Sequence, residues 1–429
     1  MWAEPSIEAP STCTAVGVAG CGCWLDPLFF LDPASWCAGP CSQRAWCFAT
    51  RTVYMATAVC VYAAFAPEWE RSTGVPLATV LTLAKRFRDG VAQHLAEKGV
   101  TVSPMLVDNA SSIPDGAVVI NACALGNESS TTWVGTAACA SPPMLWDWVS
   151  PKHTYMSALV AAGICIPPSW LVAPPCSIGA GVRTAEISLA SALLAEATAD
   201  ADVSTLLLGT LTERGHERVV LKECNALGGT LAVHRLEALQ AVTRAVQLAS
   251  GGHHALIQPD LSAFFAVGET KCCVALSSAP GSATGSTSRV LGARHAPPGS
   301  EFGRFFPPEC LPGALIDVAT AAGDVLRAHA LSAGAHAPPI VRVDLIALPG
   351  DREDSVGGRG GGGDAAVGVD ASFQGEMRWC VNEFELADFA SWMWQAACGH
   401  CSSGGMSATM DDAVCKAHAE FIACALGTT

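Results

Sequence analysis

The sequence has 429 residues, half of them hydrophobic, which excludes disorder throughout and predicts a large core divided among two or three domains. Its 39 acidic residues outnumber its 24 basic residues and give a formal net charge of −15. This charge argues against nucleic-acid backbones and anionic membrane surfaces as partners, so an anionic ligand must be held by a few local cations.

The start of the chain predicts a soluble, cytoplasmic protein. The apolar stretch at residues 53–67 is shorter than the roughly 20 residues that cross a bilayer, and the first ten residues carry no basic segment typical of a signal. The 20 cysteines are spread along the chain, many inside apolar runs, and most are expected to be core thiols in a reducing compartment. Such positions include Cys60, Cys123, Cys165, Cys272 and Cys273.

Residues 1–50 form a Cys- and Trp-rich N-terminal extension. A zinc site there is the alternative, but the cysteine spacing matches no tight zinc knuckle and no histidine accompanies it. The candidate ligands are Cys21, Cys23, Cys37, Cys41 and Cys47.

Residues 51–150 are predicted to form a small α/β domain. A strand at 52–61, a glycine-terminated helix at 77–99 and strands at 101–107 and 116–121 follow one another. This order favours a mostly parallel sheet.

Residues 151–262 and 263–429 are predicted to be two further α+β regions. The first contains helices at 153–163 and 186–199 and strands at 164–173, 218–222 and 253–261. The second contains a helix at 316–334 and strands at 271–278, 340–348 and 376–386. A Gly-rich insertion at 350–375 separates the last two strands, and it is expected to loop outward as a flexible hairpin.

Lys222 ends the strand in VVLKECNALGGT, and two glycines follow it closely. An ammonium at the end of a strand and the bare backbone of Gly228 and Gly229 suit a polyphosphate. The alternative is a lysine that reaches solvent before an ordinary turn.

Four charged residues in IVRVDLI and VNEFEL follow the period of a strand. Arg342 and Asp344 share one face of their strand, and Glu383 and Glu385 share one face of theirs. If the strands are neighbours, hard divalent cations with oxygen ligands explain why like charges gather. Two solvent-facing strand surfaces are the alternative.

Six segments in this order resemble the ATP-grasp superfamily, in particular its glutathione-synthetase-like and peptide-ligase-like members. They are SPKHTYMSALVAAGICIPPSWLV, VVLKECNALGGT, ALIQPDL, GETKCCVAL, IVRVDLI and VNEFEL, within residues 150–390. The resemblance implies an α/β (α+β) ATP-grasp fold, in which a small N-terminal α/β domain precedes two α+β subdomains that clamp ATP.

The resemblance also implies roles for individual residues. Lys152 and Lys222 match the two nucleotide-contacting lysines, and Arg342 matches the arginine beside the transferred phosphoryl group; Arg342 and Lys222 are the catalytic candidates. Gly228, Gly229 and Thr230 match the mobile loop over the phosphates. The segment that receives adenine matches Ile257, Gln258, Pro259, Asp260 and Leu261. The acidic residue near the nucleotide matches Glu269, and the metal ligands match Asp344, Glu383 and Glu385.

The implied activity is an ATP-dependent ligase that joins a small carboxylate to an amine, or to a thiol, through an acyl phosphate. ATP and Mg²⁺, with Mn²⁺ as an alternative, are the implied cofactors, and no oligomeric state follows from the sequence. A nucleotide-binding relative without ligase activity is the first rival. A Cys-rich metal-binding or redox protein is the second, because ACGHC places Cys398, His400 and Cys401 together. A helix-like run precedes ACGHC and none begins there, which favours an ordinary helix terminus.

Asp411 and Asp412 are expected to open the last helix, where carboxylates are favoured by the helix dipole.

Overall fold

The computed structural model describes fourteen segments of the chain. They are residues 58–62, 77–107, 110–121, 138–139, 143–149, 151–174, 183–187, 203–223, 233–260, 268–276, 288–296, 304–349, 377–386 and 404–426. All of them fall within the unit Val53–Thr429. The predictions for residues 1–50, for the insertion at 350–375 and for Cys398, His400 and Cys401 lie outside the described residues and stay predictions, as do the domain boundaries. Within the described residues, no helix is both long and apolar enough to cross a membrane.

The first sheet is parallel, as predicted. Its strands in spatial order are β2 (Ser103–Val107), β1 (Ala58–Tyr62), β3 (Val118–Asn121) and β4 (Ala138–Cys139). Alternate residues of β1 enter two different cores, since Val59 and Val61 pack with helix α2 (Leu77–Glu97), whereas Ala58 and Cys60 pack with Val107. Both faces of β1 are therefore covered.

The second sheet is antiparallel and has helices on one face. Its strands in spatial order are β6 (Arg183–Ile187), β5 (Ser169–Ala173), β9 (Ala255–Pro259), β7 (Arg218–Glu223) and β8 (Val233–Glu237). Val219 and Leu221 of β7 pack with helices α5 (Val203–Glu213) and α6 (Ala238–Ser250). Since side chains alternate along a strand, Lys222 lies on the face opposite these helices.

The helix predicted over 186–199 is wrong at its start. Glu186 and Ile187 belong to β6, where they pair with Trp170 and Ser169 of β5. The Ala-rich composition favours a helix locally, but pairing with a neighbouring strand outweighs this weak preference. The remainder of the predicted helix lies outside the described residues.

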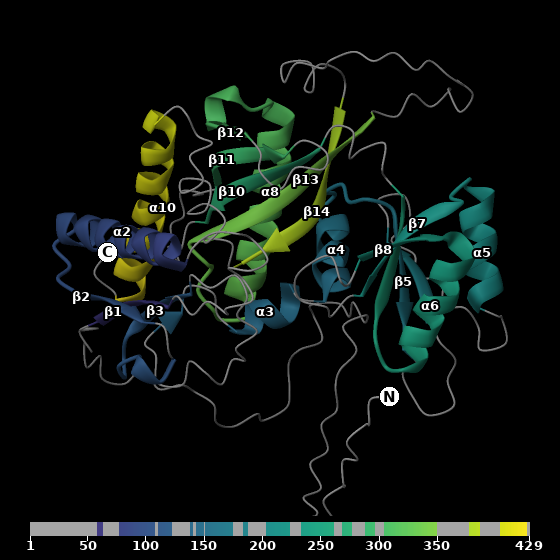
Figure 1. The fold of residues 1–429 in the computed structure, drawn as a ribbon, viewed down its shortest axis with the longest axis horizontal. Coiled ribbons are helices and arrows are strands. Elements are labelled where there is room, and N and C mark those ends of the chain that lie inside the picture. The colour runs from purple at the N-terminus through teal and green to yellow at the C-terminus, as the bar shows by residue number, and fades with distance from the viewer. Residues whose placement is uncertain are drawn as a thin grey trace, which may run out of the picture. The chain divides into compact units, whose positions relative to one another are not determined.

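The third sheet is antiparallel and contains the predicted charged strands. Its strands in spatial order are β12 (Arg304–Phe306), β11 (Arg289–Ala296), β10 (Glu269–Ala275), β13 (Ile340–Pro349) and β14 (Met377–Glu385). Helix α8 (Gly313–Ser332) covers one face, and it approaches β10 so closely that a Cβ on Gly323 would lie 2.9 Å from Val274 Cγ1. One parallel and two antiparallel sheets, each with helices, confirm the predicted fold class (Figure 1).

Two helices from the middle of the chain pack into the core under the third sheet. They are α3 (Pro143–Val149) and α4 (Lys152–Ala161). Tyr155, Met156 and Leu159 of α4 are fully buried there, in one cluster with Val381 and Phe384 of β14. This packing holds the first residue of α4, Lys152, close to β14.

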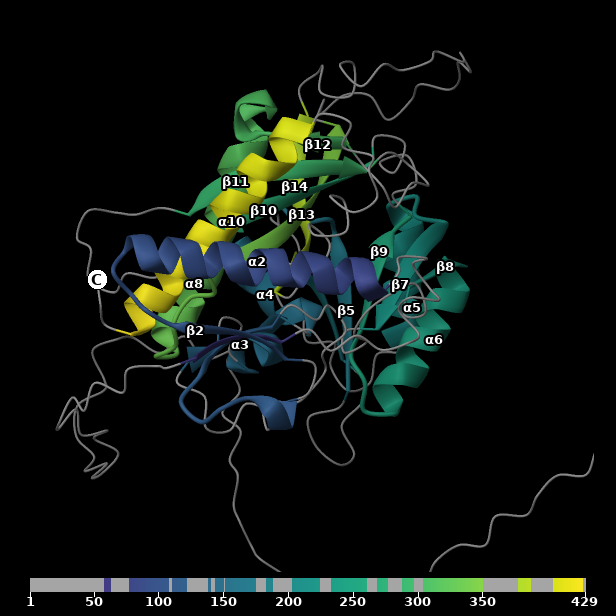
Figure 2. The same ribbon diagram turned by 60° about the vertical axis from the view of Figure 1, so that its left-hand side comes forward.

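The last helix, α10 (Gly404–Ala425), lies across α2, as both ribbon views show (Figures 1 and 2). The prediction that Asp411 and Asp412 open this helix is wrong, because it begins at Gly404. Both carboxylates instead meet cations or imidazoles of α2: Asp411 lies 3.2 Å from Arg86 Nη2, and Asp412 lies 2.8 Å from His94 Nε2.

A disulfide joins Cys165 to Cys380, so the prediction of a free core thiol is wrong at Cys165. The two residues are 215 positions apart, and their Cα atoms lie 4.6 Å apart. Beside the disulfide, Val381 N donates a hydrogen bond of 2.8 Å to Cys165 O. The prediction holds at Cys60, Cys272 and Cys273, which are buried free thiols, whereas Cys123 lies outside the described residues.

Replacing both Cys165 and Cys380 by alanine is expected to lower the free energy of unfolding by up to about 5 kcal/mol, because the disulfide closes a very long loop in the unfolded chain. Urea unfolding with and without reductant measures this loss. Reductant should destabilise the wild type and leave the double variant unchanged. Cys310→Ala, at an exposed free cysteine, is the matched control. Equal midpoints for oxidised and reduced wild type would contradict the disulfide.

Candidate active site

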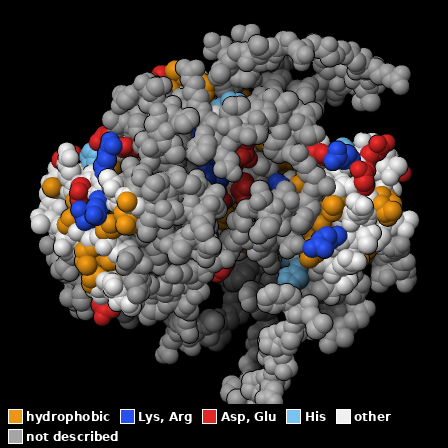
Figure 3. All heavy atoms as spheres, viewed as in Figure 1, with side chains coloured by type: hydrophobic (Ala, Val, Ile, Leu, Met, Phe, Trp, Pro, Cys, Tyr) orange, Lys and Arg blue, Asp and Glu red, His pale blue; other side chains and the backbone are white. Residues whose placement is uncertain are grey.

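The predicted charged residues meet on one face of the third sheet, opposite α8. Asp344 of β13 pairs with Glu383 of β14 and with Lys271 of β10, and Arg342 pairs with Glu385. Residues directly opposite in antiparallel strands point to the same face. We call this surface the charged face; it consists of Glu269, Lys271, Arg342, Asp344, Glu383 and Glu385. Figure 3 shows acidic and basic side chains gathered near the centre of its view.

Arg342 and Asp344 form a bidentate ion pair within one strand. Arg342 Nε donates to Asp344 Oδ1 at 2.6 Å, and Nη2 donates to Oδ2 at 2.8 Å. Asp344 is only 1% exposed, and burial alone would raise its pKa, but Arg342 and then Lys271 lower the pKa below its ordinary value. Asp344 is therefore ionised at neutral pH although it is buried.

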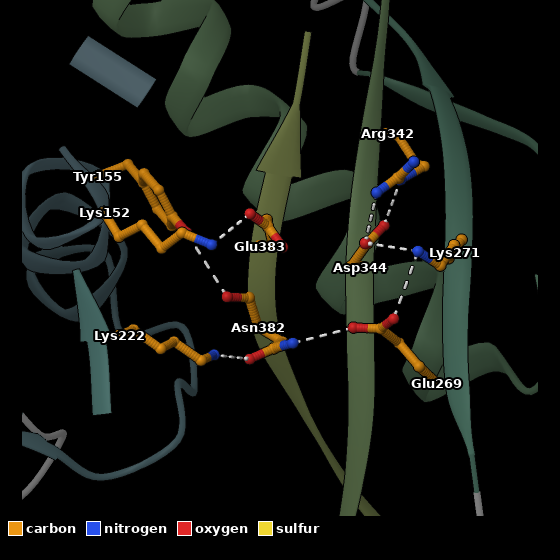
Figure 4. Close-up of polar contacts among 9 residues, drawn as sticks. All are labelled: Lys152, Tyr155, Lys222, Glu269, Lys271, Arg342, Asp344, Asn382 and Glu383. Carbon is orange, nitrogen blue, oxygen red and sulfur yellow. Dashed lines mark hydrogen bonds and ion pairs between the residues drawn. The ribbon is translucent and has the colours of Figure 1, made fainter. Parts of the chain in front are cut away.

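Lys271 lies between two carboxylates. Its Nζ donates to Asp344 Oδ2 at 3.3 Å and lies 3.4 Å from Glu269 Oε2 (Figure 4). Lys271 is not among the site residues predicted from the sequence. The signal was present, because Lys271 follows Glu269 by two residues on β10 and must share its face.

Burial and two neighbouring carboxylates destabilise the charge of Glu385. Burial raises the pKa of Glu385 to about 7, and the charges of Glu383 and Asp344 act in the same direction, while Arg342 opposes them. A further positive charge at this position would favour the ionised form of Glu385.

Two lysines reach the charged face from other elements. Lys152 of α4 donates a short hydrogen bond to Glu383 Oε1, and Lys222 of β7 donates to Asn382 Oδ1 at 3.1 Å (Figure 4). Burial works against the charge of Lys152, but Glu383, with smaller contributions from Glu385 and Asp344, holds the pKa of Lys152 above its ordinary value. Burial lowers the pKa of Lys222 to about 8, and the nearby charge of Lys152 adds to this effect.

Asn382 is a second residue of the site that was not predicted from the sequence. Its side chain bonds to Lys222 and also donates to Glu269 Oε1 at 2.9 Å. In a regular strand Asn382 would point away from Glu383. The sequence contains no signal for its actual direction.

The residues predicted to receive adenine lie at the end of β9. Gln258 is buried, and its Nε2 donates to Ser169 Oγ at 2.8 Å. β7 pairs with β9 as far as Pro259, whereas β5 pairs with β9 only as far as Ile257. Asp260 N donates to Arg218 O at 3.0 Å. Leu261 and the predicted phosphate loop of Gly228, Gly229 and Thr230 lie outside the described residues.

Three carboxylates of the charged face, those of Glu269, Asp344 and Glu383, are paired with cations. Asp344 binds Arg342 and Lys271, and Glu383 binds Lys152. Among the residues that the structure describes, no three acidic, His or Cys side chains are arranged to hold a metal ion. Metal binding at Asp344, Glu383 and Glu385 would therefore require these cations to change partners.

No protein-family model and no curated protein matches the sequence. Solved structures do match. D-cycloserine synthetase DcsG has 16% identity and a TM-score of 0.46, over 84% of this chain and 99% of that chain. A RimK domain protein ATP-grasp from Sphaerobacter thermophilus has 13% identity and a TM-score of 0.44, over 85% and 98%. D-alanine–D-alanine ligase from Bacillus anthracis, complexed with ATP, has 12% identity and a TM-score of 0.44, over 87% and 98%.

Because every one of these TM-scores lies below 0.5, the roles of individual residues rest on the chain's own contacts.

Replacing Arg342 by methionine should lower the free energy of unfolding by about 3–5 kcal/mol, because it leaves the buried charge of Asp344 with Lys271 as its remaining ion-pair partner. The double variant Arg342→Met with Asp344→Asn removes that charge and should regain part of the loss. Urea unfolding without nucleotide measures both variants. If the single and double variants were equally stable, the ion pair would not carry the effect.

Proposed function

We propose that the chain is an ATP-dependent ligase of the ATP-grasp superfamily, which joins a carboxylate to an amine through an acyl phosphate. One observation carries the proposal: cations and carboxylates from five separate elements converge on the charged face. The cations are Lys152, Lys222, Lys271 and Arg342, and the acids are Glu269, Asp344, Glu383 and Glu385. A polyphosphate that carries a divalent cation requires side chains of both signs, because cations bind its oxygens and carboxylates bind the metal ion.

The lysines are suited to bind the ATP phosphates. Lys152 and Lys222 are part-buried, and each is held by one side-chain oxygen of β14. In the proposed complex both ammonium groups turn from β14 to phosphate oxygens, which bear more charge than an amide oxygen and compete with a carboxylate. This movement of the Lys152 ammonium group releases Glu383 from its ion pair.

The carboxylates of the charged face fit a divalent cation. Release of Glu383 by Lys152 and of Asp344 by Lys271, together with ionisation of Glu385, whose pKa is about 7, would leave these three acids as oxygen ligands of the kind that Mg²⁺ and Mn²⁺ accept. When bound, the metal ion would neutralise the negative charge that builds up on the phosphate oxygens during transfer.

Arg342 has a distinct role in the proposed reaction. The substrate carboxylate attacks the γ-phosphorus in line, ADP leaves, and an acyl phosphate forms; the amine then displaces phosphate. Arg342 keeps its charge under all conditions, and its fork is oriented by Asp344. In the proposed complex, its guanidinium stabilises the equatorial oxygens of the transferring group. The expected loop of Gly228, Gly229 and Thr230 would exclude water from the acyl phosphate.

The position of β9 supports an adenine site beside these residues. Lys222 of β7 pairs with Leu256 of β9, so the segment at Gln258 to Asp260 continues from the same pair of strands. Beyond Ile257, this edge of β9 extends past its last pair with β5. Backbone groups at such an edge can bind a planar base.

The wild type should gain thermal stability with millimolar MgATP, as a ligand of the folded state provides. Lys222→Met or Lys152→Met should weaken MgATP binding about 10- to 100-fold, since a hydrogen bond to a charged group is worth about 1.5–3 kcal/mol. The exposed Lys85→Met is the matched control. Calorimetry with MgATP measures all four proteins.

Glu383→Gln separates ligase chemistry from nucleotide binding. ADP formation, screened with pairs of amino acids and small carboxylates, should fall at least about 100-fold in this variant because a charged metal ligand is lost. The exposed Glu420→Gln should keep wild-type turnover. MgATP binding without ADP formation for any pair would favour a non-catalytic relative, and an absence of MgATP binding would exclude both.

The affinity for MgATP should decline above pH 8. The free protein must protonate Lys222, whose pKa is about 8, before its ammonium can meet a phosphate, so the loss approaches about tenfold per pH unit. Lys222→Arg keeps its charge and should flatten the decline between pH 8 and pH 9. Parallel pH profiles for the two proteins would contradict this role of Lys222.

A further inference from the structure

Asn382 occupies a β-bulge between the two charged strands. Asp344 pairs with Glu383, but the next residue of β13, Leu345, pairs with Val381, so Asn382 is an extra residue in β14. Val381 points into the core with Leu345, whereas Glu383 points to the charged face. A bulge bends its strand and can redirect a side chain. This bulge turns Asn382 to the same side as Glu383 (Figure 4).

The orientation of the Asn382 amide follows from its partners. A lysine ammonium only donates hydrogen bonds, and an ionised carboxylate only accepts them. Oδ1 therefore faces Lys222 Nζ at 3.1 Å, and Nδ2 faces Glu269 Oε1 at 2.9 Å. Tyr155 of α4 adds a long contact of 3.5 Å from its hydroxyl group to the Asn382 carbonyl oxygen. The side chain is held from two sides, and it connects the second sheet with the third.

Lys222 needs such a partner before the nucleotide arrives. Its ammonium stands at the end of a flexible four-carbon chain, it is removed from solvent, and the charge of Lys152 repels it. The two lysines have different partners on neighbouring residues of β14, since Lys152 meets a carboxylate and Lys222 meets a neutral amide. A neutral acceptor holds an ammonium less strongly than a carboxylate does, so Lys222 can be released to a phosphate at a smaller cost.

We propose that Asn382 is a positioning residue, which uses its bond to Glu269 to hold the Lys222 ammonium where an ATP phosphate takes it over. This inference rests on the proposed function. Asn382 itself touches Lys222 and Glu269 and acts on the nucleotide through Lys222.

A double-mutant cycle tests the proposal. Asn382→Leu keeps a similar volume and removes the acceptor, and it should weaken MgATP binding about tenfold, while the affinity for adenosine, which has no phosphate, stays unchanged. In the Lys222→Met background, Asn382→Leu should cause no further loss. Calorimetry on the full chain measures the wild type, both single variants and the double variant.

Exchanging the amide and the carboxylate between positions 382 and 269 tests whether MgATP affinity can be rescued. Asn382→Asp alone places two carboxylates against each other and gives Lys222 a charged partner, so MgATP should bind less tightly than to the wild type. Adding Glu269→Gln restores the hydrogen bond between the two side chains and the net charge, and the pair should bind MgATP more tightly than Asn382→Asp alone. If Asn382→Leu does not fold, this comparison decides.

The outcomes separate the two proposals. Suppose that the wild type binds MgATP. If Asn382→Leu binds MgATP equally well, if the losses of Lys222→Met and Asn382→Leu add in the double variant, or if adenosine binding falls by the same factor as MgATP binding, Asn382 is not a positioning residue. The proposed function stands in each of these cases. Failure of the exchange to rescue binding would also overturn the inference. If the wild type does not bind MgATP, both proposals fail.

Discussion

A carboxylate stays ionised inside a protein only where cations or hydrogen-bond donors compensate its charge, and this constraint governs the third sheet. Asp344 is almost completely buried, and its charge is compensated by the guanidinium of Arg342, two residues earlier on the same strand. Lys271 can add its charge only because β10 lies beside β13. Lys152 can reach Glu383 only because α4 packs under β14 with Tyr155, Met156 and Leu159. The packing of apolar side chains on one face of the sheet thus sets which charges can meet on the other.

The period of a strand predicted part of the site from the sequence. It placed Arg342 with Asp344 and Glu383 with Glu385, and the structure brings these pairs opposite each other on one face. The same rule applied to Glu269 would have found Lys271. It could not have found Asn382, because one extra residue shifts the alternation and nothing in the residues themselves announces it. Residues far apart in the chain, such as Lys152 and Glu383, were associated through the family resemblance and not through any local pattern.

The fold shows the same division between local and distant causes. Apolar runs marked the central strands, and the long helix α8 was found within a few residues of its ends. The pairing of Glu186 and Ile187 with β5 and the disulfide between Cys165 and Cys380 depend on partners elsewhere in the chain. Asp411 and Asp412 were assigned to a helix start because carboxylates are favoured there. Their partners Arg86 and His94 lie on another helix, which no window of sequence around residue 411 contains.

The balance of charges on the charged face affects how quickly a nucleotide can arrive. When Glu385 is ionised, the charged face has four negative side chains. Four cations balance them, namely Lys271, Arg342 and the two lysines that reach the face from other elements. The cluster itself therefore exerts little attraction on an anion at long range. The whole chain carries −15, and a nucleotide that is also an anion approaches against that field. Dissolved salt screens such repulsion beyond about 10 Å at 0.1 M. Moderate ionic strength should therefore accelerate the encounter of this protein with its nucleotide, whereas it slows the encounter in binding sites with a net positive charge.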